Sequence, residues 1–294
     1  MGVSYEKYHG TGNDFIAVEA GASVEDWGAF AVEHCDRETG IEVNGRVGAD
    51  GVLVLSLEDE DEGGEPPRVR MRLYQPDGGT AAMCGNGARC VARWAARRER
   101  SEGLDERERT DDREFVIETP AGDRRARIGD GTIEIEMGEP SFAPGEVPLA
   151  PEREEPLIRE EIEGWEVTAV NTGVPHVVTF VEDVSTVDLE AMAPPIRHAD
   201  VFPEGANVNA AAPRRGGGGF DGRTFERGVE GETRSCGTGA VAIAAIARRL
   251  GLAEDSRVRV SPPGGDLLVT VPDEGPATLS GPVEFEGAGE LPLP

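Results

Sequence analysis

Short apolar and alternating runs divide most of the chain into predicted β-strands. Residues 52–57 (VLVLSL) form a nearly continuous apolar run, whereas residues 132–137 (TIEIEM) alternate apolar with polar side chains. Short runs of this kind, rich in β-branched residues and bounded by Gly or Pro, favour strands. On this basis we predict strands at 52–57, 69–75, 114–119, 132–137, 165–170, 176–181, 257–260 and 267–271.

Helical periodicity is found in three segments, 24–35, about 87–99 and 239–250. The third contains AVAIAAIARRL, which has small and apolar residues on every face, as expected for a helix that is buried on most sides. Gly251 is placed to end this helix. The second and third helices each follow a cysteine–glycine turn, CGNG at 84–87 and CGTG at 236–239.

The remaining segments are polar or rich in glycine. Residues 58–68 and 97–113 are predicted to be surface connections, the second of them partly helical, and residues 214–219 a flexible hairpin tip. Each half of the chain thus has the same order of strands, a cysteine–glycine turn and a helix. This order predicts an α/β (α+β) fold of two similar domains that join near residues 128–132.

The charge of the chain limits its partners. Its 57 acidic and 29 basic residues give a formal net charge of −28 over 294 residues, and Lys7 is the only lysine. Such a charge repels nucleic acid and anionic membranes, so we expect neither as a partner. The acidic residues are spread along the whole chain, which resembles proteins that stay soluble in concentrated salt. We therefore expect a halophilic protein.

The four cysteines are Cys35, Cys84, Cys90 and Cys236. They include no C-x-x-C pair, and no spaced cluster of ligands predicts a metal site. The N-terminus lacks the apolar region of a secretory signal, and no apolar run approaches the roughly 18 residues of a membrane span. These features predict a cytoplasmic protein, in a reducing compartment where structural disulfides are rare.

Cys84 and Cys236 combine two chemical properties. The N-terminus of a helix leaves backbone N–H groups unpaired and carries partial positive charge, so it stabilises anions and favours a thiolate. Two such turns around one substrate would hold a carboxylate and place its α-carbon between two sulfurs. One sulfur, as thiolate, would remove the α-proton, and the other, as thiol, would return a proton to the opposite face. This inversion at carbon requires no cofactor.

Simpler interpretations exist for each cysteine. A buried thiol is usually a small core residue, and we prefer this interpretation for Cys35 and Cys90. A disulfide between Cys84 and Cys236 is the structural alternative, which a reducing compartment disfavours. Two cysteine turns at corresponding places before helices favour function over coincidence.

A series of motifs, in order along nearly the whole chain, resembles the diaminopimelate epimerase family. These motifs are HGTGNDF (9–15), GADG (48–51), CGNGARC (84–90), TPAG (119–122), MGEP (137–140), NTGVPH (171–176), ANVN (206–209), FERGVEGET (225–233) and SCGTGA (235–240). The resemblance implies two pseudo-symmetric domains, each a curved sheet or barrel around a central helix, with the active site in the cleft between them. It assigns residues 1–129 and about 280–294 to the N-terminal domain, and 130–279 to the C-terminal domain.

The resemblance also implies roles for single residues. Cys84 and Cys236 match the acid–base pair, and His176 and Glu226 match residues that assist the reaction. The implied substrate-binding residues are Asn13, Gln75, Gly85, Asn86, Asn209, Glu226, Arg227, Gly237 and Thr238. Gln75 and Val174 depart from the family pattern, in which asparagine is common at both places. The expected function is interconversion of LL- and meso-diaminopimelate for lysine synthesis, without metal or cofactor, by a homodimer.

Three other functions stay open. A proline or hydroxyproline racemase would share the fold and both cysteines, but it would not need an anchor for a distal carboxylate such as Arg227. A relative that lacks the thiol pair is disfavoured by Cys84 and Cys236. A non-catalytic acidic binding protein would be expected to have lost a thiol or the FERG pair.

Overall fold

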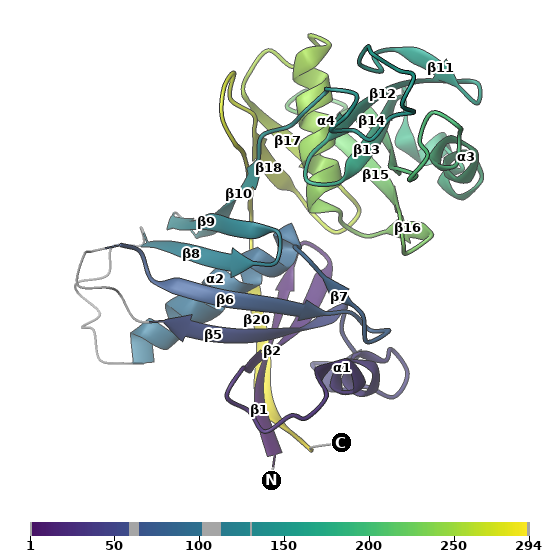
Figure 1. The fold of residues 1–294 in the computed structure, drawn as a ribbon. Helices are drawn as coiled ribbons and strands as arrows, with labels where there is room; N and C mark the ends of the chain where they lie inside the picture. The colour runs from purple at the N-terminus through teal and green to yellow at the C-terminus, as the bar shows by residue number, and fades with distance from the viewer. Residues whose placement is uncertain (1, 59–64, 102–112, 130, 293–294) are drawn as a thin grey trace. The chain divides into compact units, whose positions relative to one another are not determined.

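The computed structural model describes residues 2–58, 65–101, 113–129 and 131–292. Most of the polar connections expected at 58–68 and 97–113 therefore lie outside the described residues. The chain forms two compact units, which Figure 1 shows. Unit 1 comprises Met1–Ile135 and Gly281–Pro294, and unit 2 comprises Glu136–Ser280. The division falls within strand β10 (Thr132–Gly138), whose first residues pair with β9 of unit 1.

Unit 1 is built on one mixed sheet. Its strands are β1 (Gly2–Gly10), β2 (Asn13–Glu19), β5 (Gly51–Glu58), β6 (Arg68–Tyr74), β7 (Thr80–Ala81), β8 (Arg113–Thr119), β9 (Gly122–Gly129), the start of β10 and β20 (Glu284–Pro292). Neighbouring strands run in the order β20–β1–β2–β5–β6–β8–β9–β10, and β7 also pairs with β6. The pairs β2–β5 and β6–β8 are parallel, and the others are antiparallel.

Two helices complete unit 1, together with the small ladder of β3 (Glu42–Val43) and β4 (Arg46–Val47). Helix α1 (Trp27–Cys35) begins at Asp26, whose side chain accepts a hydrogen bond from the backbone N–H of Ala29, a common N-cap arrangement. Helix α2 (Gly85–Ser101) packs against β1, β2, β5, β6, β8 and β9. The sheet therefore curves around α2 as a central helix, as expected.

Unit 2 repeats this architecture. Its strands are β11 (Glu160–Ile162), β12 (Trp165–Asn171), β13 (Pro175–Phe180), β14 (Asn207–Pro213), β15 (Phe220–Glu226), β16 (Gly231–Thr233), β17 (Arg257–Ser261), β18 (Leu267–Thr270) and β19 (Ala277–Gly281). The order β12–β13–β14–β15–β17–β18–β19 has parallel pairs at β13–β14 and β15–β17. These match β2–β5 and β6–β8 of unit 1, so the two units share one topology.

The helices of unit 2 occupy the places of those in unit 1. Helix α4 (Gly237–Arg249) packs against β12, β13, β14, β15, β17 and β18. The residue after its C-cap is Gly251, whose backbone has a positive φ of 71° and whose N–H bonds the carbonyl of Arg248 at 3.1 Å. The N–H of Leu252 bonds the carbonyl of Ala247, which completes a Schellman motif. The prediction that Gly251 ends this helix is confirmed.

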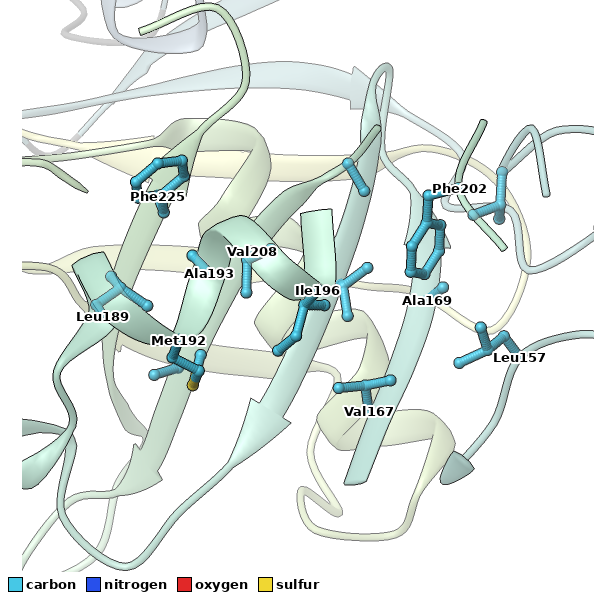
Figure 2. Packing of buried hydrophobic residues seen from close by; sticks show 14 of the residues in the cluster. Leu157, Val167, Ala169, Leu189, Met192, Ala193, Ile196, Phe202, Val208 and Phe225 are labelled. Atoms are coloured by element: carbon cyan, nitrogen blue, oxygen red, sulfur yellow. The ribbon is translucent and has the colours of Figure 1, made fainter. Parts of the chain in front are cut away.

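Helix α3 (Leu189–Arg197), which follows the short 3-10 turn η1 (Val184–Thr186), was not predicted. Pro194 and Pro195 lie inside it, and proline usually argues against a helix interior. Packing compensates for this cost. Figure 2 shows the buried face of α3, with Leu189 and Met192, over a core that includes Val167 and Val208.

All eight predicted strands are present as parts of β5, β6, β8, β10, β12, β13, β17 and β18, and the predicted helices appear as α1, α2 and α4. The hairpin tip at 214–219 connects β14 to β15, as predicted. In the described ranges, no helix is long and apolar enough to span a membrane.

Candidate active site

Cys84 lies directly before the first residue of helix α2. Its carbonyl accepts the N–H of Ala88 at 2.8 Å, and its Sγ accepts the N–H of Gly87 at 3.4 Å. The side chain is partly exposed, unlike the fully buried Cys90 within the same helix. A sulfur that faces backbone donors at a helix N-terminus is stabilised as a thiolate.

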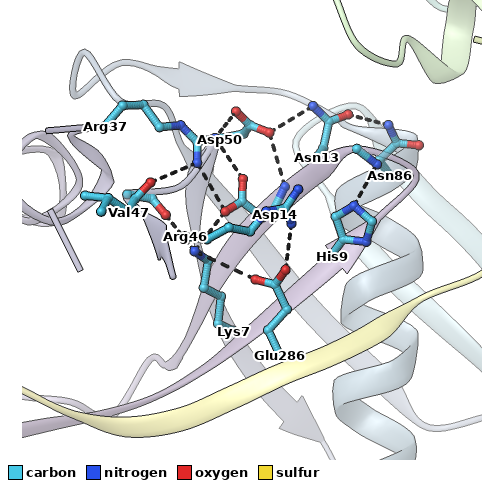
Figure 3. Close-up of polar contacts among 12 residues, drawn as sticks. Lys7, His9, Asn13, Asp14, Arg37, Arg46, Val47, Asp50, Asn86 and Glu286 are labelled. Carbon is cyan, nitrogen blue, oxygen red and sulfur yellow. Dashed lines mark hydrogen bonds and ion pairs between the residues drawn. The ribbon is translucent and has the colours of Figure 1, made fainter. Parts of the chain in front are cut away.

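Two asparagine side chains meet beside this helix start. Asn86, on α2, donates from Nδ2 to Oδ1 of Asn13, at the start of β2. Asn13 in turn donates from its own Nδ2 to Oδ2 of Asp50 at 3.0 Å. Figure 3 shows this row of side chains. We name Thr11, Asn13, Cys84, Asn86 and Arg89 the first half-site.

An ion-pair network holds the loop that carries Asn13. Buried Lys7 contacts Asp14 at 2.9 Å, and Arg37 pairs with both Asp14 and Asp50 (Figure 3). Burial alone would raise the pKa of Asp14, but hydrogen bonds from Arg37 and Lys7 outweigh it and hold this pKa below its usual value. Asp14 is therefore ionised at neutral pH. His9 Nε2 accepts the N–H of Gly12 at 3.0 Å, which supports the turn between β1 and β2.

Arg89 completes the first half-site from inside helix α2. Its side chain is fully buried, and Nη2 donates to Oγ1 of Thr11. Thr11 Oγ1 donates in turn to Oδ1 of Asn86 at 3.4 Å. Burial lowers the pKa of Arg89 to about 10, so the guanidinium still carries its charge at neutral pH.

Cys236 is the N-cap residue of helix α4, which makes it the counterpart of Cys84. Its carbonyl accepts the N–H of Ala240 at 2.9 Å, and its Sγ lies 3.4 Å from Oγ1 of Thr238. Thr238 also accepts, through its backbone carbonyl, a hydrogen bond from Thr172 Oγ1 at 2.9 Å. We name Thr172, His176, Asn209, Cys236 and Thr238 the second half-site.

The contacts of Asn209 determine the tautomer of His176. Oδ1 of Asn209 accepts from Thr224 at 2.8 Å, and Nδ2 donates to the carbonyl of Val177 at 2.9 Å, so the orientation of the amide is fixed. The same Nδ2 lies 3.1 Å from Nδ1 of His176, which must then be the acceptor. Nδ2 of Asn207 faces Nε2 at 3.4 Å, but the contact at Nδ1 is the shorter one and makes Nδ1 the acceptor. We therefore assign the proton of the neutral ring to Nε2, which lies 2.9 Å from Oγ1 of Thr238.

Burial keeps this ring neutral. His176 is fully buried, and burial lowers its pKa to about 3; the charge of Arg227 adds to the effect. With Nε2–H of His176 donating to Thr238, the hydroxyl of Thr238 can donate to Sγ of Cys236, which lies 3.4 Å away. This chain of donors favours a negatively charged sulfur at Cys236.

The FERG motif lies at the end of β15. Glu226 accepts a hydrogen bond from Thr233 Oγ1. The backbone N–H of Arg227 donates to Oδ1 of Asn207 at 2.7 Å, and its guanidinium reaches the carbonyls of Glu204 and Gly205 at 3.2 and 3.4 Å. Asn207 therefore fixes the backbone of the motif, a role that the sequence did not suggest.

Unit 1 contains five of the expected site residues, Asn13, Gln75, Cys84, Gly85 and Asn86. Unit 2 contains His176, Asn209, Glu226, Arg227, Cys236, Gly237 and Thr238. Gln75 is exposed in the turn after β6, where its carbonyl accepts the N–H of Gly78 at 2.9 Å.

Asn209, which the resemblance predicts to contact the substrate, is held by groups of its own unit. Its side chain has no exposed surface, and both its amide oxygen and its amide nitrogen bond groups of unit 2. In this structure Asn209 orients His176. Sequence reasoning missed Thr11, Thr172 and Arg89, although the Thr-Gly pair recurs in HGTG and NTG before both helices.

Comparison with known proteins adds independent support. The chain matches the family described as "Diaminopimelate epimerase" over residues 5–143 and 168–286. It is 41% identical over 298 residues to the diaminopimelate epimerase of Methanocella arvoryzae, with 98% of this chain and 96% of the relative covered. It is 43% identical over 289 residues to that of Methanothrix thermoacetophila, with 95% and 92% covered.

Solved structures share the fold at low sequence identity. A phenazine biosynthesis protein of the PhzF family from Bacillus anthracis superposes with a TM-score of 0.67 at 17% identity, with all of both chains covered. A hydroxyproline epimerase from Agrobacterium vitis superposes with a TM-score of 0.60 at 17% identity, with 99% of this chain and 92% of that chain covered. The identity to the sequence relatives and the match across both units establish that this chain is an isomerase, an epimerase independent of pyridoxal phosphate, and that it belongs to the diaminopimelate epimerase family.

Proposed function

We propose that this protein is a diaminopimelate epimerase that interconverts LL- and meso-2,6-diaminopimelate by transfer of the α-proton between two cysteines. The observation that carries the proposal is the pair of cysteines at equivalent helix starts, Cys84 before α2 and Cys236 before α4. Two units of one topology place the same chemical group at the same point, within a family named for this reaction.

The reaction requires both sulfurs to reach one α-carbon from opposite faces. One sulfur, as thiolate, takes the α-proton, and the electron pair left on carbon delocalises into the α-carboxylate. The other sulfur, as thiol, gives its proton to the opposite face of the carbon. In the reverse direction the two exchange roles. Backbone N–H groups at the helix starts, beginning at Gly85 and Gly237, stabilise the added negative charge on the carboxylate.

His176 is proposed to orient a donor chain and not to accept a proton. A ring with a pKa of about 3 stays neutral throughout the physiological range. Its Nε2–H and the hydroxyl of Thr238 lead to Cys236, so they tune this sulfur through hydrogen bonds. Glu226 and Arg227 are proposed to bind the charged groups of the substrate, where arginine offers two parallel donors to a carboxylate.

The deciding experiment is exchange of the α-proton in D₂O. Reduced protein would be incubated with LL-diaminopimelate, and separately with L-proline, and proton loss followed by NMR. We expect deuterium uptake with appearance of the meso isomer, and loss of inversion by at least a hundredfold in Cys84→Ala and in Cys236→Ala. Cys35→Ala is the matched control, because Cys35 is buried in unit 1 and burial raises its pKa to about 12.

The outcomes separate the candidate functions. Exchange with proline alone would identify a proline racemase. Absence of exchange with either substrate, in folded and reduced protein, would refute proton transfer by these thiols.

We also infer a cytoplasmic homodimer that requires salt and acts in lysine synthesis. The net charge of −28 supports the salt requirement, since self-repulsion is screened by added ions. Light scattering after size exclusion, in dilute and in molar salt, would test both the dimer and its salt dependence. A monomer at every salt concentration would refute the dimer, and unchanged thermal stability in dilute buffer would refute the salt requirement.

A further inference from the structure

Arg89 is a buried cation for which the described residues contain no counter-ion. Its side chain has no exposed surface, and it makes one hydrogen bond, from Nη2 to Thr11. Its Nε and Nη1 atoms are buried and have no hydrogen-bond partner in the part of the chain that the structure describes. Among the described residues, the groups whose charge acts on the guanidinium are the thiols of Cys90 and Cys84, and no carboxylate is among them. Taking a charge out of water without a partner destabilises a folded protein.

The fold does not require this charge. Arg89 is the fifth residue after Cys84, and the fifth residue after Cys236 is Val241, at the same position of the equivalent helix. Val241 is also fully buried. A central helix of this topology therefore packs well with an apolar residue at this position, so the reason for an arginine in unit 1 lies outside packing.

Arg89 begins a row of hydrogen bonds that all point the same way. Arg89 donates to Thr11, Thr11 donates to Asn86, and Asn86 donates to Asn13. Asn13 donates to Asp50, which ends the row. A guanidinium can only donate and a carboxylate can only accept, so the two ends determine the orientation of both amides. Each asparagine is held with its oxygen towards the arginine end and its nitrogen towards the aspartate end.

We propose that Arg89 is a positioning residue whose missing counter-ion is the substrate carboxylate at the start of α2, on which it acts through the Thr11–Asn86–Asn13 row. The positive charge raises the affinity of this helix start for an anion, and the fixed amides present N–H donors to it. Charge-assisted hydrogen bonds of this kind are stronger than neutral ones. The proposal rests on the proposed function for the identity of the anion, but its electrostatic content can be tested without diaminopimelate.

The test compares two alkylating reagents that differ in charge. Iodoacetate carries a carboxylate and iodoacetamide does not, and both alkylate a thiolate. In a Cys236→Ala background, the rate of modification at Cys84 is followed for each reagent by mass spectrometry of the peptide. Cys35 and Cys90 are fully buried, which limits their reaction. The ratio of the iodoacetate rate to the iodoacetamide rate cancels changes in thiolate fraction and reports the preference of the site for an anion.

We expect Arg89→Met to lower this ratio about tenfold, the lower end of what hydrogen bonds to charged groups contribute. Arg89→Lys retains the charge and should keep the ratio within about twofold. Arg248→Met is the matched control, because Arg248 lies in α4 and bonds the carbonyl of Val271 and the carboxylate of Asp273. It should leave the ratio unchanged. An unchanged ratio in Arg89→Met, or an equal loss in Arg89→Lys and Arg89→Met, would overturn the proposal.

The free energy of unfolding provides a second readout, which should not fall in Arg89→Met although the binding of the anion weakens. If the buried charge serves an anion, Arg89→Met removes a cost, so the free energy of unfolding should stay equal or rise while the KM for diaminopimelate increases. Lower stability together with an unchanged KM would show a structural role and overturn the proposal. A ratio that falls in a protein without epimerase activity would support the role of Arg89 and refute the proposed function, so the two can fail separately.

Discussion

The two helix starts share one backbone frame but receive their polar groups from different elements. In the second half-site, Asn209 of β14 holds His176 of β13, and His176 is linked to Cys236 through Thr238. Helix α4 has Val241 at the position of Arg89. In the first, the residues that the strand registers make equivalent to His176 and Asn209 are Phe15 and Leu53. There the polar group is Arg89, which comes from the helix.

Because the polar groups come from strands in one unit and from the helix in the other, the two sulfurs have different electrostatic surroundings. Cys84 lies near a fixed positive charge, whereas Cys236 lies at the end of a row of neutral donors. A duplicated fold therefore does not imply two equal thiols. Changes that copy one half-site into the other show how much of the difference depends on each residue.

The largest expected effect is the loss of stability on acidification that His176 causes. Its pKa is about 3 in the folded protein and about 6.5 when unfolded, so protons bind preferentially to the unfolded chain between these values. This contribution to stability is complete above pH 6.5 and is lost as the pH falls towards 3. Between pH 6 and 5 the slope should approach 1.4 kcal/mol per pH unit. Urea unfolding at fixed salt would measure it.

The control for this pH dependence replaces His176 and Asn209 by the residue types that unit 1 has at the equivalent positions, Phe15 and Leu53. The double variant His176→Phe with Asn209→Leu removes the titrating ring and its main partner together. Its stability should depend less on pH between 6.5 and 5, a range above the acidic pKa values of carboxylates such as Asp14. An equally steep slope in the double variant would assign the acid sensitivity to other groups.

A smaller effect is expected from adding one methyl group at each helix start. A Cβ atom at Gly239 would lie 2.7 Å from Oδ1 of Asn209 and 2.8 Å from Oγ1 of Thr224, so the polar row must shift. We expect Gly239→Ala to destabilise unit 2 by about 2 kcal/mol. A Cβ at Gly87 would lie 3.4 Å from Cβ of Cys84, an ordinary contact. Gly87→Ala should therefore cost less than about 1 kcal/mol, since alanine also favours a helix.

Denaturant midpoints of the two alanine variants measure this difference directly. Equal losses of stability in Gly239→Ala and Gly87→Ala would mean that the polar side chains beside α4, Asn209 and Thr224, are packed no more tightly than the side chains beside the start of α2.

The smallest effect should follow from Thr238→Val, which removes the hydroxyl between His176 and Cys236. Without it, the sulfur loses one hydrogen bond, and kcat should fall about tenfold with little change in stability. Thr168→Val is the control, because Thr168 is buried in the same unit and its hydroxyl accepts the N–H of Arg159 at 3.0 Å. Similar kcat values for the two variants would show that the hydroxyl of Thr238 does not assist Cys236.

The sequence allowed much of the fold to be predicted because its apolar patterns are local. The run at 240–250 and Gly251 were sufficient to place helix α4 and its end. Helix α3 was missed because its prolines are tolerated only through burial of Leu189, Met192 and Ile196. Strands such as β14, with the sequence NVNAAAP, lack the β-branched signal and depend on pairing with distant neighbours.

The same limit applies to the candidate site, because only the features that are local in the sequence could be predicted. Two cysteines before two helices are visible along the chain, whereas Arg89 resembles any arginine of a helix until its burial is known. Likewise, the internal use of Asn209 depends on Thr224 and Val177, which only folding brings to it.

The return of the last strand to unit 1 has a consequence for synthesis on the ribosome. Strand β20 pairs with β1 from Gly2↔Pro292 to His9↔Glu284, so unit 1 lacks one strand until residues 284–292 have been made. Unit 2 is a single continuous segment, 136–280, and can close earlier. Strand β1 is thus made long before its partner β20. During that interval the edge of β1 is exposed, a state in which strand edges promote aggregation.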